Sequence, residues 1–272
     1  MDNKIIIITG ASAGIGLSAA RQLAGKGCTV YAASRRAEES EVSATFAGQL
    51  IPVRLDVNNE TEVKSVFERV YKTHGRIDAV ISNAGNGIAG SVEDTSDAET
   101  RYQFETNFFG SVKVIRAALP YFRKQGYGKL IATSSVAGIV PIPFQAFYSA
   151  SKSALLIFMQ ALSMEVKPYG IQCCSVLPGD TKTDFTAARK YAAQSQNPES
   201  VYFQKMKTSV GKMEKDEQNG MLVDVVAGKI VKQVFRRKAK SIVIPGFQYQ
   251  LICWLFNRLP VKFRLWAVGS LY

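Results

Sequence analysis

The stretch that decides the fold is TGASAGIG, which runs from Thr9 to Gly16. It follows the apolar run KIIIIT (4–9), which predicts a buried strand, and it opens an amphipathic segment at 15–26, which predicts a helix. Its glycines let the backbone turn tightly and approach a ligand closely, and the helix end offers free N–H groups to a pyrophosphate. In this strand–turn–helix context, dinucleotide binding is favoured over a turn that only packs the helix on the sheet.

Apolar runs and amphipathic segments alternate along the rest of the chain. Further strands are predicted at 29–34, 50–55, 77–82, 129–134, 171–176 and 241–245. Further helices are predicted at 61–74, 97–125, 147–169 and 222–237. This alternation predicts an α/β, Rossmann-type doubly wound fold: a seven-stranded parallel sheet flanked by helices on both faces. Because no repeat or linker interrupts it, residues 1–272 are expected to form one domain.

Two segments depart from the alternation. Residues 184–220 form a long polar connection, which is typical of a functional lid and is expected to be a helical substrate lid. Residues 246–272 form an apolar and basic C-terminal extension rich in Phe, Trp, Tyr and Leu.

The composition excludes several classes of protein. Hydrophobic residues make up 47% and charged residues 21%, which indicates a globular chain. The cysteines (Cys28, Cys173, Cys174, Cys253) and the one histidine, His74, lack metal-ligand spacing, so no metal site is expected. Cysteines with this distribution are typical of buried thiols in a protein of a reducing compartment. The sequence also has no signal-peptide pattern before the first predicted strand. A cytoplasmic protein is therefore expected.

The net charge of +12 is unevenly distributed. From residue 200 onward there are 13 Lys/Arg and 4 Asp/Glu, so 13 − 4 = +9 of that charge lies in the last quarter, which is also the most apolar. A segment that is both basic and apolar is more typical of a protein that contacts a membrane surface than of one that binds nucleic acid. We expect no nucleic-acid partner.

The end of the second predicted strand, AASRR, bears on the choice of cofactor. An NAD site usually carries an acidic residue there for the ribose 2′-hydroxyl, whereas arginine suits a 2′-phosphate. Here Ser34 stands in the acidic position, and Arg35 and Arg36 follow it. Although two solvated arginines at a loop tip are common, the missing carboxylate favours NADP(H) over NAD(H).

The stretch FYSASK places Tyr148 and Lys152 four residues apart, hence on one face of a helix. Ser134 and Ser135 end the fifth predicted strand, at the sheet edge that carries the glycine turn. A free tyrosine titrates near pH ~10, and a nearby cation lowers a pKa by about one to three units. Lys152, together with an oxidised nicotinamide, is therefore expected to make Tyr148 an acid–base group usable near neutrality.

Together, TGASAGIG, SNAG, TNFFG, SSVAG, YSASK and LPGDTKT resemble the motif set of the short-chain dehydrogenase/reductase family, in its main subfamily. The resemblance covers about residues 3–183, with the motifs in order and at family spacing. Within the family, NAGNGIAGSVED and PIPFQAFYSASKSAL look most similar to hydroxysteroid- and retinol-type dehydrogenases.

The resemblance implies a role for each catalytic residue. Tyr148 would pass a proton to or from the substrate oxygen while hydride moves to or from nicotinamide C4. Ser135 would hold that oxygen, with Ser134 as the weaker candidate. Lys152 would bind the nicotinamide ribose and lower the tyrosine pKa, and Asn107 would position a water in the proton relay.

The resemblance also extends the set of cofactor and substrate residues. The cofactor-binding set is Gly10, Ser12, Gly14, Ile15, Gly16, Ser34, Arg35, Arg36, Asp56, Val57, Asn83, Ala84, Gly85, Tyr148, Lys152, Pro178, Gly179 and Thr183. The substrate set is Ser135, Pro141, Phe144 and Tyr148, in an apolar cleft. Asp56 with Val57, and the SNAG motif, lie at strand ends where ligands bind in such sheets, although each alone also suits a structural role.

These expectations lead to an NADP(H)-dependent oxidoreductase that interconverts a lipophilic secondary alcohol and its ketone, steroid-like or similar. The alternatives are a reductase of 3-ketoacyl or ketosphingoid-type ketones, which would use the same residues, and a non-catalytic NADP(H)-binding sensor or scaffold. Family habit implies a homodimer or homotetramer through the helices at 97–125 and 147–169.

The C-terminal extension leaves four interpretations open. Its uncharged run of sixteen residues, 242–257, is shorter than the ~20 residues of a membrane span, so a span is rejected. Arg258, Lys262 and Arg264 interleave with apolar residues, a pattern suited to the surface of an anionic membrane. A core helix, a lid over the cleft and a dimer contact remain as the other three.

Overall fold

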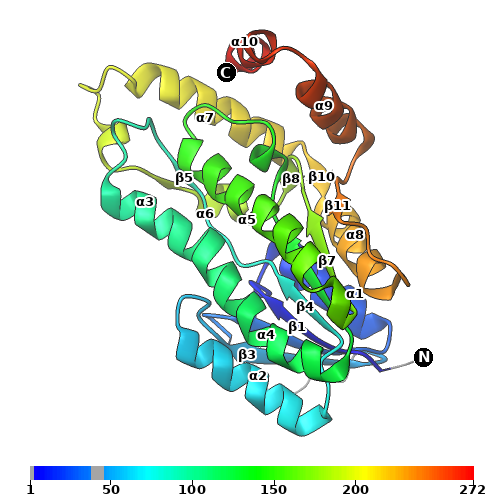
Figure 1. Ribbon diagram of the computed structural model, residues 1–272. Helices are drawn as coiled ribbons and strands as arrows, with labels where there is room; N and C mark the ends of the chain where they lie inside the picture. Colours follow the sequence, from blue (N-terminus) through cyan, green and yellow to red (C-terminus); the bar gives the residue numbers. More distant parts are fainter. Residues whose placement is uncertain (1–2, 38–45) are drawn as a thin grey trace.

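A seven-stranded parallel sheet forms the centre of the computed structural model, which describes residues 3–37 and 46–272 (Figure 1). The strand order is β11-β7-β6-β4-β1-β2-β3, and every pairing in the sheet is parallel. The strands are β1 (Ile5–Thr9), β2 (Thr29–Ser34), β3 (Gln49–Arg54), β4 (Ala79–Ser82), β6 (Gly128–Thr133), β7 (Ile171–Val176) and β11 (Ile242–Val243). The predicted doubly wound α/β fold is confirmed.

The side chains of β1 explain why the sheet is covered on both sides. Successive side chains of a strand point to opposite faces. Ile5 and Ile7 enter the larger core cluster, while Ile6 and Ile8 enter the second. A strand that is apolar at every position can be buried only between two layers of helices.

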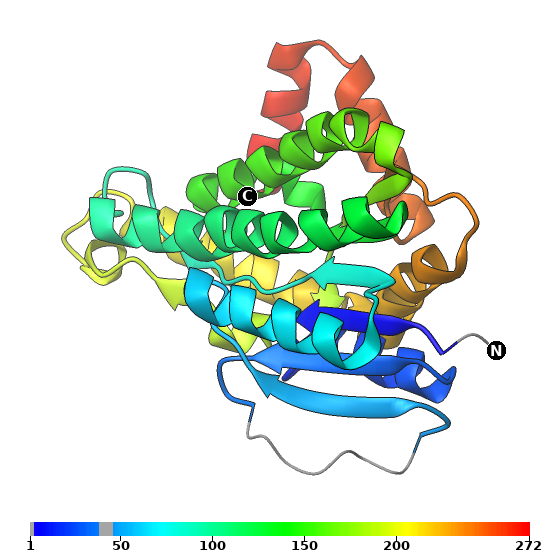
Figure 2. The same cartoon turned by 60° about the horizontal axis from the view of Figure 1, so that its bottom comes forward.

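The helices form those two layers (Figures 1 and 2). One face packs against α1 (Gly14–Gly25) and α8 (Val223–Phe235), whose apolar residues join Ile6 and Ile8. The other face packs against α2 (Glu60–His74), α4 (Ser111–Gln125) and α5 (Ala146–Glu165). The glycine turn lies between β1 and α1, at the carboxyl edge of the sheet where ligands bind in this architecture.

The helix predicted at 97–125 is interrupted. It begins as α3 (Asp97–Phe104) behind a capping box at Ser96, continues as the π-helical turn Glu105–Gly110, and ends as α4. π-helical turns inside α-helices are frequent at functional sites. This turn carries Asn107.

The segment predicted as a polar lid at 184–220 is largely structured. It contains α6 (Phe185–Ala188) and the sixteen-residue α7 (Phe203–Gln218). Two short strand pairs fix it to the body: β8 (Thr181–Lys182) with β10 (Met221–Leu222), and β5 (Ile88–Ala89) with β9 (Lys190–Tyr191).

The C-terminal extension forms α9 (Phe247–Arg258) and α10 (Val261–Leu271), which project from one end of the molecule in both ribbon views (Figures 1 and 2). Among residues 3–37 and 46–272, no helix is long and apolar enough to cross a membrane.

Candidate active site

A cavity of about 670 Å³ follows the carboxyl ends of β1, β2, β3, β4, β6 and β7 and reaches the C-terminal helices. It gathers most of the residues predicted from the sequence. Those that line it are Gly10, Ser12, Gly14, Ile15, Ser34, Arg35, Arg36, Asp56, Val57, Asn83, Ala84, Gly85, Ser135, Tyr148, Lys152, Pro178, Gly179 and Thr183. Residues as far apart in the chain as Gly10 and Thr183 therefore share one cleft.

The glycine turn is tied to the end of β4 by a small hydrogen-bond network. The Thr9 hydroxyl accepts from the backbone N–H groups of Asn83 (3.1 Å) and Ala84 (3.2 Å), and the Asn83 amide donates to the Gly10 carbonyl (3.2 Å). Gly10 has φ +65°, and a Cβ there would lie 2.7 Å from the Ala84 Cα. Gly16 lies behind the turn, where a Cβ would lie 2.3 Å from the Gly10 carbonyl oxygen. Only glycine fits at both positions.

The N-terminus of α1 is left without a side-chain cap. Its N-cap residue is Ala13, and its first turn carries no acidic residue. In contrast, Asn59 caps α2 and Ser96 caps α3. The first N–H groups of α1 therefore remain available to an anion, as a pyrophosphate-binding helix requires, and the cradle fits a dinucleotide.

The residues predicted to select the cofactor lie at the end of β2. Ser34 is buried, whereas Arg35 and Arg36 are exposed at the mouth of the cavity. Within the part of the chain that the structure describes, neither arginine makes an ion pair. Guanidinium groups at this position suit the binding of a phosphate.

Tyr148 and Lys152 share one face of α5, as their spacing predicts. The Lys152 Nζ lies 5.8 Å from the centroid of the Tyr148 ring and donates a hydrogen bond to the Thr133 carbonyl at 3.0 Å. Lys152 is 4% exposed, so its ammonium group is held away from bulk water at the end of β6. A Cβ at Gly85 would lie 3.3 Å from the same Nζ, which indicates how closely the loop after β4 approaches it.

Burial shifts the pKa values of this pair in opposite directions. Burial raises the pKa of Tyr148 to about 12; the hydrogen bond with Ser135 opposes the rise and the Glu217 carboxylate adds to it. Burial also lowers the pKa of Lys152 to about 8. In the protein alone, desolvation therefore keeps the pKa of Tyr148 above its ordinary value, and the lowering expected from Lys152 together with an oxidised nicotinamide stays a prediction. Near pH 7 the phenol is protonated.

The two candidate serines have different surroundings. Ser135 caps the short turn at 136–138 by accepting from the Ala137 N–H at 3.0 Å, donates to the Pro178 carbonyl at 3.4 Å, and lines the cavity beside Tyr148. The Ser134 hydroxyl instead donates to the Lys152 carbonyl at 2.8 Å and is 3% exposed. The geometry favours Ser135 as the group that faces a substrate.

Asn107 lies behind the cavity and is fully buried in the π-helical turn. Its amide donates to the Asn86 carbonyl (3.0 Å) and to the Ser151 hydroxyl (3.1 Å), and its Oδ1 accepts from the Asn86 N–H (2.9 Å). Ser151 in turn donates to the Tyr148 carbonyl at 2.7 Å. Asn107 is thus connected to the helix turn that carries the tyrosine.

Two substrate residues predicted from the sequence, Pro141 and Phe144, do not line the cavity. Pro141 is exposed, and Phe144, at φ +59°, packs with Ile142 against the small core cluster under α7. Ile142 lines the cavity instead, as do Phe185 of the lid and apolar residues of α9 and α10. The Phe185 ring lies 5.9 Å from the Tyr148 ring.

The cavity also contains acidic groups to which no role was assigned from the sequence, although Asp180 lies within the LPGDTKT motif. Asp180 accepts a hydrogen bond from the Tyr249 hydroxyl at 2.9 Å, and burial raises its pKa. Glu217 accepts from the Thr186 hydroxyl at 2.6 Å and pairs with the buried Arg189. Among the described residues Asp180 has no cation partner, whereas Glu217 has one.

Gln103 is a functional residue that the motifs missed. It is fully buried, accepts from the Ile88 N–H at 2.7 Å, and donates to the Asn86 carbonyl at 2.9 Å. It therefore fixes the loop that Asn107 holds from the other side. A glutamine four residues before the asparagine of TNFFG, on the same helix face, was the available signal.

The fold and the cavity define a dinucleotide-binding α/β protein, and the family follows from comparison with known proteins. The chain belongs to the short-chain dehydrogenase family, because the family model described as "short chain dehydrogenase" matches residues 4–194. It is an NAD(P)-dependent oxidoreductase that acts on CH–OH groups.

Particular relatives extend over most of the chain. It is 39% identical, over 87% of its own length and 86% of the relative's, to a protein named 3-ketodihydrosphingosine reductase from Bacteroides thetaiotaomicron. It is 33% identical, over 98% of its length and 93% of the relative's, to the NADPH-dependent 1-acyldihydroxyacetone phosphate reductase of Saccharomyces cerevisiae. The crystal structure of a short-chain dehydrogenase from Streptomyces avermitilis is similar at a TM-score of 0.82 and 26% identity, covering 98% of each chain.

Proposed function

We propose that this protein is an NADP(H)-dependent reductase that converts lipophilic ketones to secondary alcohols. The observation that carries this proposal is the position of the Tyr148 hydroxyl, in a cleft that joins the dinucleotide cradle to apolar walls. Bound NADPH would supply the hydride from nicotinamide C4. The protein would supply the proton and hold the carbonyl oxygen.

The position of Tyr148 suits the reductive direction. Its phenol is protonated near pH 7 and lines the cavity, so it can donate a proton to a carbonyl oxygen bound there. Ser135 would hold that oxygen by a second hydrogen bond. Lys152 would bind the nicotinamide ribose, and the Asn107–Ser151 contact would keep this turn of α5 in position.

A tyrosine substitution separates an enzyme from a non-catalytic NADP(H) sensor or scaffold. We expect Tyr148→Phe to lower turnover at least about 10³-fold, within the range of general acid–base catalysis. NADPH binding, followed by nucleotide fluorescence, should change little, because the phenol is not part of the glycine cradle. A variant that retains its turnover would refute the mechanism, and a wild-type protein that binds NADPH but reduces no ketone would support the sensor.

The preference for NADP(H) rests on Ser34, Arg35 and Arg36. Among residues 3–37 and 46–272, Arg35 and Arg36 make no ion pair, and Ser34 stands where an NAD site usually has an acidic residue, so a 2′-phosphate would meet two cations there. The yeast relative named above is NADPH-dependent.

Parallel fluorescence titrations with NADPH and NADH test this preference. We expect tighter binding of NADPH, and a loss of about 10- to 100-fold for NADPH with Arg35→Asp, since hydrogen bonds to charged groups contribute about 1.5–3 kcal/mol. NADH binding should stay unchanged or improve. Tighter binding of NADH by the wild-type protein would overturn the preference.

Asp180 favours one substrate class among lipophilic ketones. A carboxylate without a cation partner, beside the apolar walls of the cleft, suits a ketone that carries an ammonium group. A ketosphingoid is such a long-chain amino ketone, and the Bacteroides relative is named for one. Arg264 also lines the cavity, but its guanidinium donates to the Phe256 carbonyl at 2.8 Å. A steroid-like or 3-ketoacyl substrate would leave Asp180 unused.

An Asp180→Asn variant distinguishes these classes. With a long-chain amino ketone we expect KM to rise about tenfold or more, because the ammonium loses its charged partner. With a neutral ketone of the same chain length, KM should change less than about threefold. Equal effects on the two ketones would mean that Asp180 does not bind the ammonium, and the steroid-like class would then be favoured.

A further inference from the structure

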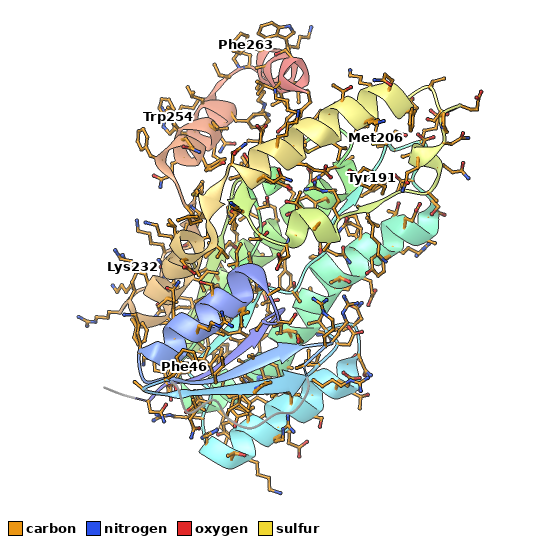
Figure 3. All side chains as sticks on the ribbon, turned by 180° about the vertical axis from the view of Figure 1, so that it is seen from behind. Phe46, Tyr191, Met206, Lys232, Trp254 and Phe263 are labelled. Atoms are coloured by element: carbon orange, nitrogen blue, oxygen red, sulfur yellow. The ribbon has the colours of Figure 1, made fainter. Side chains whose placement is uncertain are left out.

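The C-terminal helices carry large apolar side chains on the side that faces away from the body of the protein. Only Tyr249, Cys253 and Phe256 of α9 are buried, and no residue of α10 is. Figure 3 shows Trp254 and Phe263 on helices at the outer end of the molecule. We call this surface the outer C-terminal face; its members are Phe247, Leu251, Trp254, Phe263, Leu265 and Trp266, each between 44% and 79% exposed.

The charge of this region is entirely positive. The last acidic residue of the chain is Asp224, and residues 225–272 contain nine Lys/Arg and no Asp or Glu. On the outer C-terminal face, the Arg258 guanidinium lies 4.4 Å from the centroid of the exposed Trp254 ring. Lys262 is exposed beside Phe263, whose ring lies 5.6 Å from that of Trp266. Aromatic rings beside cations are typical of a membrane–water interface.

The same face does not suit a second copy of the chain. A two-fold contact through it would bring two sets of cations together with no acidic side chain from residues 225–272 to neutralise them, and like charges across an interface cost free energy. An anionic lipid surface carries the opposite charge to these cations. Its acyl chains also provide an apolar environment for the indole and phenyl rings. At about 1.5 Å per residue, the twelve-residue α9 is only about 18 Å long, so it fits in the plane of the surface.

The outer C-terminal face is continuous with the cleft. Ile252, Leu255 and Leu271 are 45%, 39% and 58% exposed, and each also lines the cavity that contains Tyr148. An apolar molecule can therefore move from the outside of the helices to the catalytic tyrosine along apolar surface.

We propose that α9 and α10 dock on the surface of an anionic bilayer and admit lipophilic ketones from it into the cleft. The admission of ketones into the cleft rests on the proposed reductase function, whereas the docking on the bilayer does not. Basic residues near the surface and burial of the aromatic rings both strengthen the docking.

Vesicle flotation tests the docking step without any turnover. Wild-type protein is mixed with vesicles of phosphatidylcholine alone, or of phosphatidylcholine with phosphatidylglycerol. We expect it to float with the anionic vesicles and to remain in solution with the neutral ones. The double variant Trp254→Glu/Trp266→Glu should lower the bound fraction at least about tenfold, and so should Arg258→Glu/Lys262→Glu.

Val201→Glu is the matched control, because Val201 is 88% exposed but lies far from these helices in the sequence, between the short turn at 194–196 and α7. It should float like the wild type, and every variant should bind NADPH normally if it is folded. Docking is refuted if the wild type stays in solution with both vesicle types, or if the control loses as much as the double variants. Gel filtration that shows a dimer in the wild type and a monomer in Trp254→Glu/Trp266→Glu would assign the face to a second copy instead.

A rate measurement then tests the delivery step. With a long-chain ketone dissolved in anionic vesicles, the double variants should lose at least about tenfold in rate. With a short, water-soluble ketone, their rate should equal that of the wild type. If flotation succeeds but neither ketone is reduced, the proposed function fails and docking stands.

Discussion

At the scale of single residues, the decisive feature is how burial acts on Tyr148 and Lys152. Desolvation moves the pKa of the tyrosine up to about 12 and that of the lysine down to about 8, in each case toward the neutral form. Near pH 7 the phenol is protonated and Lys152 is still mostly an ammonium group, so the pair places a proton donor beside a buried cation.

Lys152 is expected to reduce stability while serving function. Its pKa in the folded protein, about 8, lies below the ordinary 10.5, so folding disfavours the ammonium form below pH 8. We expect Lys152→Met to raise the free energy of unfolding at pH 7 by about 1–3 kcal/mol, after allowing for the lost bond to Thr133. The gain should shrink as pH rises from 8 to 10.5, where the lysine of the unfolded chain also becomes neutral.

Urea unfolding at several pH values measures this effect, together with the loss of activity that we expect. Lys205→Met is the control, because Lys205 is exposed on α7 and should change stability by less than about 0.5 kcal/mol. A loss of stability in Lys152→Met at pH 7 would mean that the lysine is better solvated than its burial indicates.

Spacing in the sequence was enough to find Tyr148, Lys152 and the serine pair, because motif residues keep their separation along one helix or one strand end. It could not give the pKa of Tyr148, which depends on burial by elements far away in the chain. Nor could it find Asp180, whose environment is set by Tyr249 on α9, 69 residues later. Long-range packing supplies what local spacing lacks.

At the scale of elements, the turn from β1 into α1 combines a close approach with an uncapped helix end. A Cβ at Gly16 would lie 2.3 Å from the Gly10 carbonyl oxygen and 2.6 Å from the Asn83 amide nitrogen. We expect Gly16→Ala to lower the free energy of unfolding by about 2 kcal/mol or more and to weaken NADPH binding, because backbone must shift.

Gly25, at the other end of α1, provides the comparison. A Cβ there would meet no atom within 4 Å, so Gly25→Ala should raise stability by about 0.5–1 kcal/mol through helix propensity. Thermal unfolding and NADPH titration of both variants measure these effects. Equal melting temperatures for the two would show that the turn is less tightly packed than the structure describes.

Apolar runs predicted the strands because buried parallel strands must be apolar on both faces. The π-helical turn at Asn107 was not predictable, since residues 97–125 carry an ordinary helical pattern and the turn depends on contacts with other loops. Helix α7 could have been predicted, because its buried residues Met206, Val210 and Met213 recur at helical spacing. The many polar residues around them hid this pattern.

At the scale of the whole molecule, the core keeps every cysteine out of contact with solvent. Cys28, Cys173, Cys174 and Cys253 are between 0% and 7% exposed, and burial raises the pKa of Cys173 and Cys174 to about 12. We expect a thiol reagent such as Ellman's reagent to modify less than one thiol per native chain at pH 8 within minutes. In denaturant it should modify four.

The reactivity of Cys253 also reports on movement of α9, because Cys253 is one of the residues of this helix that are buried against the body. If Cys253 alone reacts when anionic vesicles are added, α9 must separate from the body on docking. Rapid reaction of several thiols without vesicles would contradict the packing of the core.

The two functions of the cleft come from different parts of the chain, and this separation affects how the substrate specificity of such a protein can change. The groups proposed to handle cofactor and proton all precede residue 184, while much of the wall facing the substrate comes from the lid and the last two helices. Heritable changes in the later part can alter which ketone is accepted without touching the chemistry. A library confined to residues 184–272 should therefore retain turnover in far more of its members than one of equal size spread over 3–183, and it offers the shorter route to a new specificity.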